Sequence, residues 1–124
     1  MVALKRGKIK CFEIGNLKTK KDWGFAGDYA VGMHMMLQSK NAKDYILATG
    51  ESHSIEDFIE VCAQKLEIPN WRKHIVVNNS ICKRKNSGSL IGNSDSIETE
   101  PGGSRTKNFE ELVGYMIDFE LGDE

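Results

Sequence analysis

Hydrophobic residues along this chain follow two periods, one typical of strands and one typical of helices. Residues 8–14 alternate, with Phe12 and Ile14 on one face, and this period of two predicts a short strand. The apolar runs at 45–48 and 75–77 predict two further short strands, of which the first is expected to be buried. Strands separated by helical segments predict an α/β fold with about three helices and three short strands.

The longest helical pattern lies between the first two predicted strands and indicates a helix from about Gly27 to Gln38. Its apolar residues share one face, so the helix is expected to be largely buried and its methionines to fill the core. The polar residues 39–43 are expected to end it. The apolar stripe consists of Ala26, Ala30, Met33 and Leu37, widened by Val31, Met35 and Met36.

Capping signals mark the first residues of two more helices. Ser54 is followed by Asp57 three residues later, and Asn108 is followed by Glu111 at the same spacing. The first of these helices should end before Pro69, because the residue before a proline avoids helical geometry. The two stripes are Ile55, Phe58, Ile59, Cys62 and Leu66, and Phe109, Leu112, Val113, Met116 and Ile117.

The segment from Asn78 to Lys107 has few apolar residues and is rich in Ser, Asn, Gly and charge. A long segment of this composition cannot bury enough apolar surface to offset the entropy of ordering it. We therefore expect residues 78–107 to form a long flexible loop within a single region that spans residues 1–124.

Charge is unevenly distributed, although the net charge is only -1 over 124 residues. The first 21 residues contain seven Lys or Arg and one acid, whereas the chain from residue 98 onward is acidic. A basic segment suits a phosphorylated ligand, and it is equally typical of a solvated face. The 40% of hydrophobic residues is ordinary for a globular domain of this length.

Several classes of protein are not favoured by the sequence. It contains no signal-peptide pattern and no apolar run long enough to cross a bilayer, so we expect a cytoplasmic location and no membrane partner. It contains no nucleophile elbow either, which does not favour a hydrolase of that type. A basic start without a recognition motif does not favour nucleic acid. Three widely spaced cysteines fit reduced thiols, and the histidines lack the spacing of a zinc site. These residues are Cys11, Cys62 and Cys82, with His34, His53 and His74.

The stretch from Gly15 to Gly24 combines a Gly-Asn turn, three lysines, Asp22 and Trp23 directly before a helical pattern. Backbone N–H groups and cations in front of a helix form a good anion site, and a solvated turn is the simpler interpretation.

This stretch resembles a segment of the GDP-mannose 4,6-dehydratases, which are extended short-chain dehydrogenase/reductases. The resemblance rests on Gly15-Asn16-Leu17 and Asp22-Trp23-Gly24. It continues through Asp28-Tyr29, residues 35–38 and the run from Asp44 to Ser54. It covers roughly residues 8–66, and it returns weakly at residues 89–92 and 108–113.

The resemblance implies the C-terminal, substrate-binding part of such an enzyme, with the Rossmann half missing. In the family, that half holds NADP and carries a Tyr-x-x-x-Lys pair. Here Tyr29, Tyr45 and Tyr115 are followed four residues later by Met, Thr and Phe, and no G-x-G-x-x-G occurs. We therefore expect no catalytic and no cofactor-binding residue in this chain, and whether it is an enzyme stays open.

The resemblance also implies substrate-binding residues for GDP-mannose or GDP, namely Gly15, Asn16, Lys21 and Arg84. Lys21 stands where the family usually has an arginine that contacts the diphosphate. Lysine keeps the charge and loses the bidentate fork. Arg84 is all that remains of an Arg-Pro-x-Glu motif, and a solvated basic run is the alternative. Asp22 is expected to orient a lysine or to cap a helix.

Four hypotheses for function follow. The first is a nucleotide-sugar-binding module without activity of its own, related to a lyase that converts GDP-mannose to GDP-4-keto-6-deoxymannose on the path to GDP-fucose. The second is an enzyme part completed in trans by a Rossmann half or a full-length subunit. The third is an interaction module that docks on a full-length dehydratase, and the fourth is a partial gene model. Alone, the chain is expected to expose an apolar patch and to be marginally stable or to associate with itself.

Overall fold

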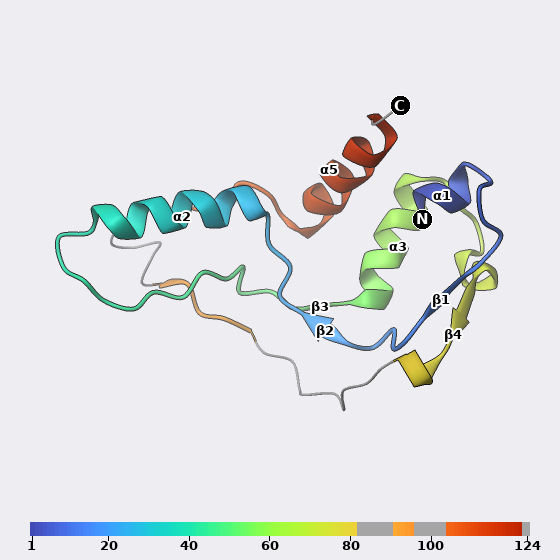
Figure 1. Ribbon diagram of the computed structural model, residues 1–124, viewed down its shortest axis with the longest axis horizontal. Helices are drawn as coiled ribbons and strands as arrows, with labels where there is room; N and C mark the ends of the chain where they lie inside the picture. Colours follow the sequence, from blue (N-terminus) through green and yellow to red (C-terminus); the bar gives the residue numbers. More distant parts are fainter. Residues whose placement is uncertain (82–90, 96–103, 123–124) are drawn as a thin grey trace.

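The computed structural model describes residues 1–81, 91–95 and 104–122 of the chain. The α/β class predicted from the sequence is confirmed, and so are all three predicted helices (Figure 1). The elements are α1 (Val2–Lys5), β1 (Phe12–Ile14), β2 (Lys20–Lys21), α2 (Ala26–Gln38), β3 (His53–Ser54), α3 (Ile55–Lys65), the 3-10 turn η1 (Trp71–His74), β4 (Ile75–Val77), the 3-10 turn η2 (Asn79–Ile81) and α5 (Phe109–Gly122).

The described strands form two short pairs rather than one sheet. β1 and β4 are parallel, with Phe12 opposite Ile75, while β2 and β3 are antiparallel, with Lys21 opposite His53. The strand predicted at 8–14 is confirmed for its last three residues, and the strand predicted at 75–77 is confirmed in full. β2 and β3 have two residues each, too few for a periodic signal, and were not predicted.

The main core lies where α3 and α5 pack together and α1 covers them (Figure 1). Val113 is fully buried at its centre, and Cys62 is buried beside it, as the helical stripes predicted. Burial raises the pKa of the Cys62 thiol above its ordinary value. Met1 and Val2 also pack here, so the N-terminal turn belongs to the core although the sequence pattern did not predict α1.

Both predicted capping boxes are present. The Ser54 hydroxyl accepts a bond from the Asp57 N–H at 3.0 Å, and the Asp57 carboxylate accepts one from the Ser54 N–H at 2.7 Å. Asn108 and Glu111 exchange the same two bonds at 2.9 and 2.8 Å. These bonds satisfy N–H groups that a helix leaves unpaired at its start, which fixes where α3 and α5 begin.

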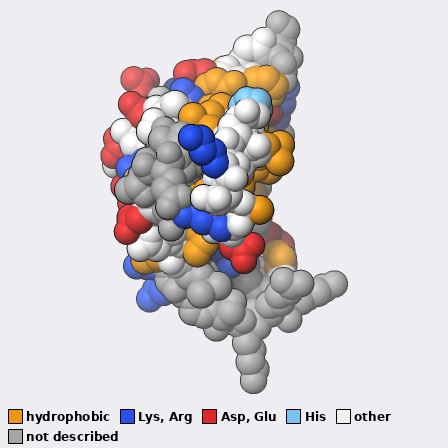
Figure 2. Space-filling model, turned by 90° about the vertical axis from the view of Figure 1, so that its left-hand side faces the viewer, with side chains coloured by type: hydrophobic (Ala, Val, Ile, Leu, Met, Phe, Trp, Pro, Cys, Tyr) orange, Lys and Arg blue, Asp and Glu red, His pale blue; other side chains and the backbone are white. Residues whose placement is uncertain are grey.

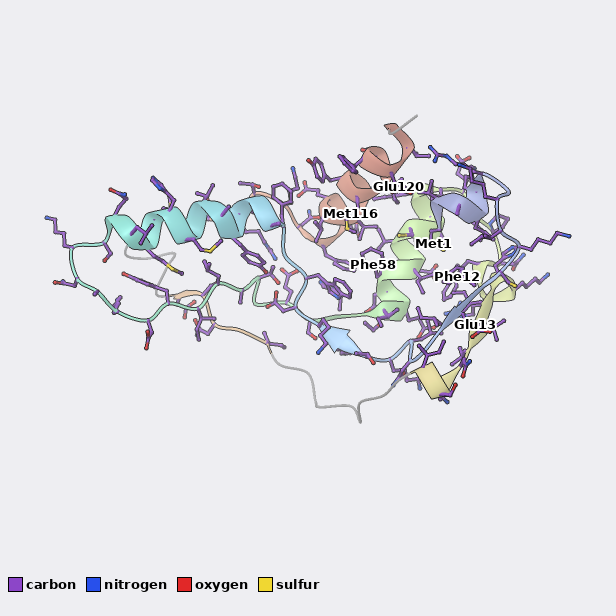
Figure 3. All side chains as sticks on the ribbon, viewed as in Figure 1. Met1, Phe12, Glu13, Phe58, Met116 and Glu120 are labelled. Carbon is purple, nitrogen blue, oxygen red and sulfur yellow. The ribbon has the colours of Figure 1, made fainter. Side chains whose placement is uncertain are left out.

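The prediction that α2 is largely buried is wrong. It extends away from the core (Figures 1 and 3), and only Gly32 is buried along its length. All four residues of its apolar stripe are exposed, including Met33 at 54% and Leu37 at 83%. The described part of the chain supplies no element to cover this stripe, so its methionines fill no core here.

The prediction of a buried strand at 45–48 is also wrong. These residues are irregular in conformation, and Ile46 is 56% exposed. They run close to Gly92, where an added Cβ would lie 2.3 Å from the Cβ of Ala48. An apolar sequence becomes a strand only when a neighbouring strand completes its backbone hydrogen bonds. None of the described residues does so here.

The expected flexible loop at 78–107 falls partly outside the described residues. Cys82 and Arg84 lie outside them, so nothing is said of their positions. Within the described part, Asn79–Ile81 form η2, and residues 104–107 make the contacts given below. The flexibility of the whole segment stays a prediction.

Candidate functional site

The Gly-Asn turn follows β1 and is stabilised by its own side chain. Gly15 is buried, and the Asn16 Oδ1 accepts a hydrogen bond from the Lys18 N–H at 2.9 Å. This bond closes an Asx turn, which is a common conformation of Asn at the end of a strand. The turn stands at the carboxyl end of the parallel pair, beside Asn78, whose N–H donates to the Ile14 carbonyl at 2.8 Å. Ligands bind at this end of parallel strands in many α/β proteins.

The turn then crosses the first residues of α3. The Ile55 N–H donates to the Thr19 carbonyl at 3.1 Å, and the Glu56 N–H donates to the Leu17 carbonyl at 2.9 Å. These two N–H groups are therefore satisfied within the protein. A phosphate at this turn would have to be held by lysine side chains, not by the amides that begin α3.

The lysines of β2 point to different surroundings because side chains alternate along a strand. Lys20 lies near Asp57, whose pKa is lowered mainly by the hydrogen bonds from Ser54 and further by the charges of His53 and Lys20. Lys20 and Lys21 are both exposed. Lys21 is thus available at the surface, three residues after Lys18, whose N–H closes the Asx turn.

Asp22 has a different role from the one predicted. Its carboxylate accepts hydrogen bonds from the Thr49 N–H at 3.0 Å, from the Thr49 hydroxyl at 2.7 Å and from the Gly50 N–H at 3.2 Å. Among the described residues it neither caps a helix nor bonds to a lysine. It ties the chain just after Lys21 to the loop at 49–51, where Gly50 has a φ of +74° that favours glycine.

A second group of contacts joins the segment 104–107 to the same loop and to the first turn of α2. Arg105 donates to Glu51 Oε1 at 2.8 Å, and this hydrogen bond is the main reason that the pKa of Glu51 lies below its ordinary value. Thr106 donates to Asp28 through its N–H at 2.9 Å and its hydroxyl at 2.6 Å. The sequence indicated neither pair, because their members lie more than 50 residues apart.

His53 lies at the entry to α3, as predicted. Its ring stacks on Phe109 with centroids 3.8 Å apart, and its carbonyl accepts a bond from the Trp23 indole N–H at 3.1 Å. The described residues contain no group of three His, Cys, Asp or Glu arranged to hold a metal ion. None of the described helices is long and apolar enough to cross a membrane.

A cleft lies between α2 and the irregular segment at 47–49, with Arg105 at its edge. Tyr29 faces it, and the pKa of its hydroxyl is raised by burial and by the nearby charges of Asp22 and Asp28. Figure 2, seen from the far end of α2, shows hydrophobic side chains at the surface of this part of the molecule. Gly15, Asn16 and Lys21 do not line the cleft, so it is separate from these three predicted residues. Arg84, the fourth, lies outside the described residues.

The described residues do not fit a dinucleotide. The turn after β1 leads into β2 instead of into a helix, and β1 has one parallel neighbour, β4. A dinucleotide site requires a glycine-rich turn that joins a strand directly to a helix whose N-terminus meets the pyrophosphate. No strand, glycine-rich turn and helix follow one another in this way among the described residues.

Comparison with known proteins is consistent with this architecture. A family model described as GDP-mannose 4,6 dehydratase matches residues 1–116. GDP-mannose 4,6 dehydratase 1 of Arabidopsis thaliana is 33% identical over 108 residues, which make up 87% of this chain and 30% of the plant protein. The GDP-mannose 4,6 dehydratase of Homo sapiens is 48% identical over 54 residues, or 44% of this chain and 14% of that protein.

Solved structures with the same fold have much lower sequence identity. A dTDP-glucose 4,6-dehydratase from Bacillus anthracis in complex with NAD is similar with a TM-score of 0.80 at 14% identity, and covers 99% of this chain and 38% of its own. RMD from Pseudomonas aeruginosa complexed with NADPH gives 0.78 at 16% identity, over 94% of this chain and 37% of its own. The chain spans less than two fifths of the length of each of these relatives. Its sequence match over residues 1–116 shows that it belongs to the GDP-mannose 4,6-dehydratase family.

Proposed function

We propose that this chain binds the nucleotide end of a GDP-sugar, with GDP-mannose as the ligand, at the turn formed by Gly15, Asn16 and Lys21. The observation that carries the proposal is the position of this turn. It ends a strand of the parallel pair, is closed by the Asn16 side chain, and is followed at once by exposed lysines.

The charge around the turn supports a diphosphate more than a neutral ligand. Lys18, Lys20 and Lys21 are exposed within four residues of one another. The nearest carboxylate in the chain, Asp22, is turned toward Thr49 and Gly50, where two N–H groups and a hydroxyl compensate its charge. The electrostatic repulsion between Asp22 and an anion beside Lys21 is therefore weaker than the sequence alone indicates.

The family activity, a dehydration that uses NADP, requires more than the described residues supply. Turnover needs the cofactor and a catalytic tyrosine-lysine pair, and this chain has no such pair. The proposed role is thus substrate binding without independent activity. Arg84, outside the described residues, is proposed as a second cation for the ligand.

Calorimetric titration with GDP-mannose tests this proposal through three variants. Lys21→Met should weaken binding about tenfold, which corresponds to about 1.4 kcal/mol. Lys21→Arg should tighten it, because the guanidinium adds a second hydrogen bond to phosphate. Lys40→Met, an equal charge change at the far end of α2, should leave affinity unchanged. Equal losses in Lys21→Met and Lys40→Met, or no binding by the wild type, would refute the proposal.

A second candidate function is completion of an enzyme in trans. Residues 45–48 are apolar and irregular, Leu47 and Ala48 line the cleft, and none of the described strands pairs with them. An added strand could order such a segment into a sheet edge. A separately produced Rossmann half of a related dehydratase would supply such a strand. Mixing the two should restore turnover of GDP-mannose, and Ile46→Pro should abolish it because proline removes a backbone donor. Absence of both turnover and complex formation would contradict this candidate.

A further inference from the structure

His53 lies directly opposite Lys21 in the antiparallel pair of β2 and β3 (Figure 1). Side chains of opposite residues in such a pair project from the same face, with their Cβ atoms about 4.5–5.5 Å apart. The side chain of His53 is 28% exposed and Lys21 is exposed, so both reach solvent on this face. A diphosphate held by Lys21 would therefore lie close to the imidazole ring.

The imidazole ring is held in place by two neighbours. It stacks on Phe109 with centroids 3.8 Å apart and an angle of 3° between the ring planes. Its Nε2 lies 3.5 Å from Glu51 Oε2, a distance at which a protonated imidazole and a carboxylate form an ion pair. The position of the ring is thus set by the fold before any ligand binds.

A proton on His53 changes the net charge of a small group of side chains. Arg105 donates to Glu51 Oε1 at 2.8 Å, while Glu51 Oε2 faces His53. When His53 is neutral, the guanidinium and the carboxylate cancel each other. When His53 is protonated, the three side chains together are positive. In ordinary surroundings histidine gains this proton between about pH 8 and pH 5.

Other charged groups face the same ring and do not change over this range. Asp57 and Glu60 of α3 and Glu110 of α5 line one hollow with His53, and Lys20 lies on the side of Asp57. Carboxyl groups titrate near pH 4 and lysine near pH 10, so all four keep their charge between pH 6 and pH 8. Their effect on an anion is the same at both pH values, and the difference comes from His53.

The ligand is also constant in charge over this range. The diphosphate of GDP-mannose is esterified at both ends, and only a terminal phosphate has a second proton that titrates near pH 6. Any change in affinity with pH therefore reports on the protein.

From this register and these contacts we infer that His53 is a further residue of the nucleotide turn, which supplies a positive charge for the diphosphate when it is protonated. Binding of GDP-mannose and uptake of a proton by His53 consequently favour each other. This inference rests on the proposed function, because it requires the diphosphate to lie beside Lys21.

Calorimetric titration with GDP-mannose at pH 6 and pH 8 tests the inference. The wild type should bind about threefold more tightly at pH 6, which is the size of effect that one added surface charge has on a charged partner. His53→Phe keeps a ring against Phe109 and removes the group that binds the proton, so its affinity should be the same at both pH values. His53→Gln keeps a polar partner for Glu51 without a charge and should behave likewise. His34→Phe, the same replacement at an exposed residue of α2, should keep the threefold difference.

NMR of the imidazole resonances measures the same linkage in the wild type. Saturating GDP-mannose should raise the midpoint of the His53 titration by about half a pH unit, which is the shift equivalent to a threefold ratio of affinities. The midpoint of His34 should stay where it is.

The outcomes separate this inference from the proposed function. Equal wild-type affinities at pH 6 and pH 8, a pH dependence that persists in either His53 variant or disappears in His34→Phe, or an unmoved His53 midpoint would each overturn the inference and leave the turn as a site for GDP-mannose. Absence of binding at both pH values would overturn the proposed function itself, and the inference with it.

Discussion

The carboxylate of Asp22 accepts hydrogen bonds from both the N–H and the hydroxyl of Thr49, at 3.0 and 2.7 Å. These residues are 27 positions apart, and the whole of α2 lies between them. The contact therefore closes the loop that contains α2 and fixes the start of the helix relative to β2.

Replacing Asp22 should loosen this closure. Asp22→Ala leaves two N–H groups and a hydroxyl without their acceptor and should lower the free energy of unfolding by roughly 1–3 kcal/mol. Urea unfolding followed by tryptophan fluorescence measures the loss. Asp44→Ala, a change at an exposed acid, serves as the control, and equal effects of the two substitutions would contradict the assigned role of Asp22.

The capping box of α3 predicts a dependence of stability on pH. Hydrogen bonds from Ser54 hold the pKa of Asp57 below its ordinary value of 3.8, so the folded state favours the ionised carboxylate. Its contribution is present above pH 3.8 and is lost as the pH falls through the lower folded pKa. Asp57→Asn should remove this acid dependence. Ser54→Ala keeps the backbone N–H bond to Asp57, so it should cost about 1 kcal/mol at pH 7 and reduce the acid dependence only in part. Unfolding curves between pH 2 and 7 test this, and an unchanged slope would count against it.

Gly92 lies where the segment 91–95 packs against residues 46–48. A Cβ at this position would lie 2.3 Å from the Cβ of Ala48 and 3.2 Å from the Cγ2 of Ile46. Gly92→Ala should therefore push the two segments apart and destabilise the protein by about 1–3 kcal/mol. At Gly122 no atom lies within 4 Å of an added Cβ, and Gly122→Ala is the matched control. Equal melting temperatures of the two variants would show that 91–95 does not pack against 46–48.

Local signals in the sequence were sufficient for the compact part of the fold. The capping pairs Ser54–Asp57 and Asn108–Glu111 indicated the starts of α3 and α5. The stripes indicated most of the residues on the buried faces, but Met116 was wrongly included, because it is 49% exposed. These features depend on residues within one or two turns of each other, which is the range over which periodicity and capping act.

The same reasoning was wrong where burial depends on an element that the described chain does not supply. The stripe of α2 and the run at 45–48 are as apolar as core elements, yet Leu37 and Ile46 are exposed. A pattern of hydrophobic residues indicates that a face is to be covered and does not indicate by what.

The candidate site was predictable only as far as the turn. The sequence placed Gly15, Asn16 and Lys21 in one short segment, and the structure keeps them there. It did not indicate that Asp22 would be paired with Thr49, or that Arg105 and Thr106 would contact Glu51 and Asp28, because those pairs meet only in the folded chain.

The nucleotide turn is tested most directly by a titration of the isotope-labelled chain with GDP-mannose, followed by NMR, with GMP as the control. Saturable shifts centred on the amides of Gly15, Asn16 and Lys21, and weaker ones with GMP, are the predicted result. A well-dispersed spectrum that does not change with GDP-mannose, or changes only around the cleft at Tyr29, would contradict the claim that this turn binds the nucleotide sugar.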